Sequence, residues 1–197
     1  MRRLVILMIF SVLGLTACAT DFRVVQIPLR NADLYPRSRT RGEITVAVDG
    51  ITESERVIAY FGVDLTKERI LPVNIIVSNH GNGRYIIKPS DILLLRGNEV
   101  VDPMLVETVV EVVKEEHGRM SGKTGRMVNA YFSNLALQES VLAPRETYQG
   151  VLFFKTKAEE EDSNFIVRKL FREGSMKMYV GVTNVETGER VQFDLFL

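Results

Sequence analysis

A short glycine-containing segment in the middle of the chain has residue types that could bind a phosphate. Gly122, Lys123 and Thr124 match the end of the phosphate-binding loop, which needs another glycine five residues before Gly122. His117 occupies that position, and Gly118 is one place off. No strand is expected directly before this segment, so its backbone amides would not converge on a phosphate. We therefore expect the chain to bind no nucleotide.

The two histidines of the chain, His80 and His117, lie far apart in sequence and form no recognised metal-binding motif. Glu115 and Glu116 directly precede His117, so a loose metal site here is one interpretation. The preferred interpretation is a solvated helix end, where a basic residue interacts favourably with the helix dipole. We expect no metal and no other cofactor.

Side chains that could act in catalysis also lack a recognised arrangement. The chain contains no Gly-x-Ser-x-Gly sequence, which would present a serine nucleophile. The pair Glu115 and Glu116 does not have a spacing typical of a general acid and base. We therefore expect no catalytic residues and a protein that is not an enzyme.

The N-terminus has the order of a secretory signal. Arg2 and Arg3 are followed by the short apolar run 4–10, and then by smaller residues that end in Leu15-Thr16-Ala17-Cys18. The apolar run is shorter than the about 20 residues that span a bilayer, which disfavours an uncleaved anchor or a buried helix. The sequence predicts residues 1–17 to be a signal peptide.

Leu15-Thr16-Ala17-Cys18 resembles the lipobox of bacterial lipoprotein precursors. The resemblance implies cleavage between Ala17 and Cys18, and attachment of fatty acyl chains, such as palmitate, to Cys18. It also implies that the lipid bilayer of the bacterial cell envelope holds the mature protein through this residue. Ala19, rather than an acidic residue, follows the cysteine, which in this family implies the outer membrane, facing the periplasm.

Length and charge restrict the class of protein further. The chain has 197 residues, so removal of the first 17 leaves 180, enough for one domain with a sizeable core. The 25 basic and 25 acidic residues balance, and loss of Arg2 and Arg3 gives a net charge of −2. Nucleic-acid-binding domains carry a basic excess, so we expect no nucleic acid. Cys18 is the only cysteine, which excludes a disulfide within the chain.

Residues 18–41 are predicted to be a lipidated N-terminus followed by a basic tether. Its basic residues outnumber Asp21 and Asp33; they are Arg23, Arg30, Arg37, Arg39 and Arg41. Attraction to anionic lipid headgroups is one interpretation of this charge, and a solvated linker is the preferred one. Val25, Ile27 and Leu29 alternate with polar residues or proline, so part of the tether is a candidate edge strand.

Residues 42–197 are predicted to form one domain that is mainly β. Alternating apolar residues predict strands at 43–48, 71–78, 85–87, 91–95 and 148–154, a weaker strand at 57–63, and a hairpin from 178–182 and 190–197. An acidic run at 159–162 and a short helix at 165–171 precede the hairpin. This pattern favours an immunoglobulin-like β-sandwich with a helical insertion. Two stretches, 71–79 and 142–154, also resemble strands of uncharacterised bacterial lipoproteins with immunoglobulin-like domains.

The helical insertion is expected at about 102–140. Asp102 and Pro103 predict the start of its first helix, and an apolar stripe that includes Tyr131, Phe132 and Leu135 marks the second. The stripe has two interpretations: it packs on the β-domain, or it forms an exposed face for a partner.

Two functions remain from the sequence. The first is a membrane-anchored, non-enzymatic envelope lipoprotein that presents a binding or structural β-sandwich to an envelope partner, which is a protein or a glycan. The second is a small-ligand carrier or an enzyme, with a pocket between the sandwich and the helices. A pocket of several hundred Å³ with convergent polar groups would favour the second.

Overall fold

The computed structural model describes residues 22–118, 120, 122–155 and 176–197 of the chain, and these are mostly β. Within these ranges, the first antiparallel sheet has the order β1-β2-β3-β7, and its strands are Ser38–Arg41, Ile44–Gly50, Ile70–Asn79 and Thr147–Lys155. The second sheet has the order β5-β4-β8-β9, with strands Glu99–Val101, Tyr85–Arg96, Met176–Asn184 and Arg190–Phe196. A short strand β6, Ser140–Leu142, pairs with β4. The prediction of a mainly β domain is confirmed.

The two sheets bury one face against each other. Leu152 and Phe154 of β7 belong to a core that also includes residues of β4, β8 and β9, such as Phe193. Val151 and Phe153 point to the opposite face of β7, where they pack against the helices. Successive strand residues point to opposite faces, as expected for the strand predicted at 148–154. All ten residues of β3 are buried, because both faces of this strand are covered.

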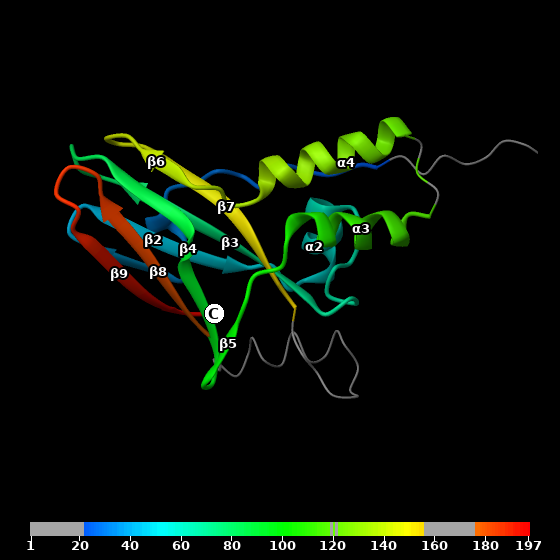
Figure 1. Ribbon diagram of the computed structural model, residues 1–197, viewed down its shortest axis with the longest axis horizontal. Coiled ribbons are helices and arrows are strands. Elements are labelled where there is room, and N and C mark those ends of the chain that lie inside the picture. Colours follow the sequence, from blue (N-terminus) through cyan, green and yellow to red (C-terminus); the bar gives the residue numbers. More distant parts are fainter. Residues whose placement is uncertain (1–21, 119, 121, 156–175) are drawn as a thin grey trace, which may run out of the picture.

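The helices gather at one end of the first sheet (Figure 1). They are α2, Ser54–Phe61; α3, Val106–Glu116; and α4, Gly122–Leu135. The predicted strand at 57–63 is wrong, because Val57 and Phe61 bury one side of a helix four residues apart. Pro103 lies outside α3 and forms a bridge with Phe154, so this helix begins later than predicted.

Strand β4 joins two segments that were expected as separate strands, 85–87 and 91–95. Its pairing with β8 shifts register between Ile87 and Ile92. Pro89 lies within this irregularity and has no amide hydrogen to donate to a neighbouring strand. The expected interruption is therefore a bulge within one continuous strand. The predicted terminal hairpin is confirmed as β8 and β9, whereas residues 159–171 lie outside the described part of the chain.

Residues 22–35, here called the N-terminal strap, pack along the outer face of the first sheet. The sequence predicted a solvated tether here instead. Three of its residues are buried: Phe22, Ile27 and Ala32. The backbone amide of Ala32, in the short helix η1 (Ala32–Leu34), donates to Ser78 Oγ at 2.9 Å. The edge strand of the sheet is β1, which follows the strap, and not residues 25–29. Burial of apolar side chains therefore outweighs the basic charge of this segment.

The packing around Gly150 of β7 leaves no room for a larger residue at this position. An added Cβ would lie 2.5 Å from Leu137 Cα and 2.9 Å from Leu137 N, at the point where the chain leaves α4. We expect Gly150→Ala to lower the free energy of unfolding by about 1–3 kcal/mol, because backbone must move. Equilibrium urea unfolding measures this change. Gly125→Ala on α4 is the control, since its Cβ would meet nothing within 4 Å and a helix favours alanine; equal stability of the two variants would contradict the expected clash.

Candidate functional site

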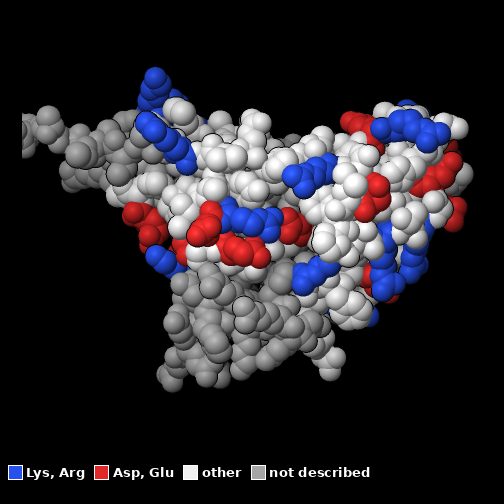
Figure 2. All heavy atoms as spheres, turned by 180° about the vertical axis from the view of Figure 1, so that it is seen from behind, with Lys and Arg blue, Asp and Glu red and all other residues white. Residues whose placement is uncertain are grey.

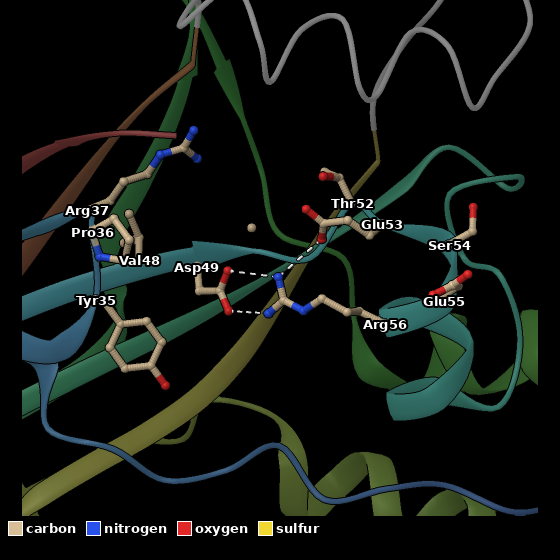
Figure 3. Close-up of a pocket in the computed structure, with 11 residues that line it drawn as sticks. Tyr35, Pro36, Arg37, Val48, Asp49, Thr52, Glu53, Ser54, Glu55 and Arg56 are labelled. Atoms are coloured by element: carbon tan, nitrogen blue, oxygen red, sulfur yellow. Dashed lines mark hydrogen bonds and ion pairs between the residues drawn. The ribbon is translucent and has the colours of Figure 1, made fainter.

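A cavity of about 720 Å³ lies between the end of β2, the start of α2 and the segment that leads into β1 (Figure 3). The strand and the helix approach each other here because only a few residues connect them. Eleven residues line the cavity: Tyr35, Pro36, Arg37, Val48, Asp49, Gly50, Thr52, Glu53, Ser54, Glu55 and Arg56. The cavity is therefore polar and carries charges of both signs.

Arg56 and Asp49 form the central ion pair of this cavity. Arg56 Nη2 lies 2.5 Å from Asp49 Oδ2, and Arg56 Nη1 lies 3.1 Å from Glu53 Oε2 (Figure 3). The Arg56 guanidinium also lies over the ring of Tyr60, 5.9 Å from its centroid. Burial alone would lower the pKa of Arg56, but the hydrogen bond and the charge of Asp49 outweigh it and raise this pKa. Arg56 is therefore a permanent cation held by two carboxylates.

Tyr35 adds a phenol to the same cavity. Burial, and then the negative charge of Asp49, raise the pKa of Tyr35 above its ordinary value. The phenol is therefore neutral at physiological pH and can donate a hydrogen bond. The lining contains neither histidine nor cysteine, and its Arg56 pairs with Asp49 and Glu53. This arrangement can recognise a small polar molecule by hydrogen bonds.

The ion pair of Asp49 and Arg56 should contribute modestly to stability. Their side chains are 23% and 37% exposed, so solvent screens the attraction. We expect Asp49→Asn to lower the free energy of unfolding by about 1 kcal/mol at low salt, and by less in 1 M NaCl. Glu53→Gln is the control, because Glu53 is more exposed and its loss leaves the bond to Asp49 intact. A salt-independent loss at Asp49 would show that charge is not its cause.

The cavity residues were not identified from the sequence. Asp49 lies just after the predicted strand that ends at residue 48, and Arg56 lies just before a segment predicted as a strand instead of a helix. Seven positions separate the two residues, a spacing that belongs to no recognised motif. Only a prediction of α2 as a helix would have shown that Arg56 points towards the end of β2.

The stripe of α4 that was a candidate partner face lies mainly within the structure. Phe132 is fully buried, and Leu135 packs against the same core. The hydroxyl of Tyr131 donates to the backbone oxygen of Tyr60 at 2.6 Å. Burial, and then Tyr60, raise the pKa of Tyr131 to about 12. Phe132 is therefore a core residue and is not accessible to a partner, which corrects that interpretation. Ala17 and Cys18 lie outside the described residues.

The other residues considered for chemistry are dispersed. His80 donates its backbone amide to Glu43 O, and His117 makes an edge contact with the ring of Phe22 at 5.8 Å. Gly122 begins α4, which follows a helix and not a strand. Among the described residues, no three His, Cys, Asp or Glu side chains cluster as metal ligands do. No helix in this part of the chain is long and apolar enough to cross a membrane.

Comparison with known proteins gives no family. No family model and no curated protein matches the chain. Two solved structures from Bacillus subtilis have a similar course of the backbone. The candidate lipoprotein ycdA has 15% identity and a TM-score of 0.40 over 81% of this chain, which spans 38% of ycdA. The yjhA protein has 11% identity and a TM-score of 0.45 over 81% of this chain and 95% of its own. At these scores neither likeness assigns a function to this chain.

Proposed function

We propose that this chain is a non-enzymatic lipoprotein of the bacterial cell envelope, anchored in the lipid bilayer through acylated Cys18. The observation that carries the proposal is the leader, in which Leu15-Thr16-Ala17-Cys18 follows a short basic head and a short apolar run. In this proposal, the domain from the strap onwards is presented to an envelope protein partner. Ala19 after the cysteine supports an outer-membrane position, facing the periplasm.

The strand order supports an immunoglobulin-like arrangement of the two sheets. The neighbours β2, β3 and β7 are the first, second and fifth strands of such a fold when β1 and the short strand β6 are left out. The other sheet, β5-β4-β8-β9, then contains the third, sixth and seventh strands and one extra edge strand. Loops at the ends of such a domain commonly carry binding residues, which is compatible with the proposed presentation to a partner.

Analysis of the mature protein tests the anchor, and affinity capture tests the partner. We expect the mass of the mature protein to lack residues 1–17 and to exceed the polypeptide mass by that of the acyl chains. We also expect the protein in the membrane fraction. A protein with residues 1–17 intact and no added mass would contradict the proposal. Capture of the acylated protein from its own membranes, with cross-linking, would then identify the envelope protein partner.

A small-ligand carrier is the second candidate, and the cavity at Asp49 and Arg56 favours it. Its volume of about 720 Å³ lies within the range of about 300–1,000 Å³ that is typical of small-molecule sites. It lies between the first sheet and α2, and not against the helices α3 and α4 of the expected insertion. Thermal shift with small carboxylates, amines and sugars tests this function. A ligand that stabilises the wild type but not Arg56→Gln would support it, and no shift with any of the three classes would contradict it.

A further inference from the structure

An exposed surface with both basic and apolar side chains runs along α4 and the N-terminal strap. Lys123, Arg126 and Met127 lie on one side of α4, at spacings of three and four residues, and all three are exposed. Val25 of the strap is 59% exposed, and Met127 is 53% exposed. We call this the strap–α4 surface, formed by Arg23, Val25, Lys123, Arg126 and Met127.

The strap is fixed to this side of α4 by direct contacts. The ring of Phe22 packs edge-on against Tyr131 at 5.9 Å, and the Tyr131 hydroxyl lies 3.5 Å from Val25 O. The amide of Val25 donates to Ala59 O of α2 at 2.7 Å, so the strap runs between the two helices. Tyr131 is one helical turn beyond Met127 and faces the same side. Figure 1 shows the strap passing along α4 to its N-terminal end.

The position of Phe22 limits the distance between this surface and the proposed anchor. Cys18 precedes Phe22 by four residues, which span at most about 14 Å when fully extended. Phe22 is buried at the helical end of the domain, against His117 and Tyr131. An acylated Cys18 would therefore hold the helical end, and not the far end of the sheets, next to the bilayer.

We propose that the strap–α4 surface rests on an anionic lipid bilayer. This inference depends on the proposed anchor at Cys18 and adds an orientation to it. Lys123 and Arg126 complement negative headgroups, and the first turn of α4 has no acidic residue. The acidic residues Glu111, Glu115 and Glu116 of this end belong to α3, where Lys114 pairs with Glu111 at 2.8 Å.

The apolar members of the surface fit the same partner. Met127 and Val25 lie beside the cations, so they can enter the interface while the charges stay among the headgroups. Helices that lie on membranes combine these two kinds of side chain in the same way. Figure 2 shows basic side chains at the top of the helical end of the molecule, with side chains of both signs below them and over the sheets. The orientation would turn the far end of the sheets towards the partner.

Site-directed spin labelling of the acylated full-length protein tests this orientation. Acylation blocks the sulfur of Cys18, so a nitroxide attaches only to a cysteine introduced by Met127→Cys or Val185→Cys. Val185 is the matched control, because it is 42% exposed and lies in the β8–β9 turn, away from the helices. In vesicles of phosphatidylglycerol and phosphatidylethanolamine, we expect the label at 127 to be protected from a water-soluble relaxation agent. The label at 185 should stay accessible.

Charge reversal tests the cause of the contact. In the Met127→Cys protein, Lys123→Glu with Arg126→Glu should lower the ratio of docked to undocked molecules by at least about 30-fold, because the loss of each basic residue near an anionic surface costs about fivefold and the two new carboxylates are repelled. The matched pair Arg39→Glu and Arg41→Glu on β1 should leave that ratio unchanged, as these exposed arginines lie outside the surface. Equal protection in phosphatidylcholine vesicles would overturn the assignment to anionic lipid.

The outcomes separate the orientation from the anchor. If the mature protein carries acyl chains and is bound to the vesicles, but both labels are equally accessible, the orientation is wrong and the anchor stands. If the mass of the intact mature protein shows no acyl chains, both the proposed function and the proposed orientation are wrong. A label at 127 that is protected only when a membrane protein is present would overturn the lipid assignment in favour of a protein partner.

Discussion

Phe132→Ala is expected to lower the free energy of unfolding by about 3–5 kcal/mol. Phe132 is fully buried and contacts the rings of both Phe61 and Phe153, with centroid distances of 6.1 and 5.9 Å. These three rings connect α4, α2 and β7. Loss of the Phe132 ring therefore leaves a cavity at the junction of the helices and the first sheet. Denaturant unfolding, followed by circular dichroism, measures the change.

Tyr131→Phe is the matched control for this prediction. It keeps the ring that packs against Phe22 but removes the hydroxyl that donates to Tyr60 O, so it should cost only about 1 kcal/mol. Met127→Ala, at an exposed position of the same helix, should change stability by less than either. A Phe132→Ala protein with wild-type stability but without its partner would restore the earlier interpretation of this side chain as an exposed contact.

The strands were predictable because alternation of side chains is a local property. In β7, Leu152 and Phe154 alternate with Val151 and Phe153, and this pattern alone assigns the two faces. The same pattern could not show that both faces of this strand would be covered. That outcome depends on the helices and the strap, which reach the outer face from distant parts of the sequence.

The strap and α2 were misassigned for physical reasons that differ. The predicted tether 18–41 is rich in arginine, which is typical of a linker, but three buried side chains decide where residues 22–35 lie. Segment 57–63 contains β-branched and aromatic residues that favour a strand. Burial of Val57 and Phe61 beside Phe132 and Phe153 makes it a helix, and Gly62, with a φ of 79°, ends it.

The candidate site was not predictable because its residues meet only in three dimensions. Asp49 ends a strand, Arg56 begins a helix, and Tyr35 comes from the strap. None of these residue types indicates a site by itself, and no fixed spacing connects them. The leader is the opposite case, because its function depends on the order of residues and not on a fold.

Cys18→Ser should abolish the attachment of fatty acid. The thiol of Cys18 is the only one in the chain, and serine offers no sulfur for a thioether. Each buried CH₂ of an acyl chain contributes about 0.8 kcal/mol to membrane binding, so loss of the chains removes most of the affinity of the protein for the bilayer. We expect radiolabelled palmitate in the substituted protein to fall to background.

Ala19→Ser is the matched control, since it changes the neighbouring residue and keeps the thiol. Its labelling should equal that of the wild type, and its unfolding midpoint should equal that of Cys18→Ser, because both positions precede Phe22, the first buried residue in the described part of the chain. Retention of the Cys18→Ser protein on vesicles gives a second readout. Without an anchor near the bilayer, the strap–α4 surface binds it through Arg23, Lys123, Arg126 and a few apolar contacts alone. At about 1 kcal/mol for each basic residue, this attraction is too weak to retain the protein on vesicles at physiological salt. Equal palmitate labelling of Cys18→Ser and wild type would show that the chain is not acylated at this residue.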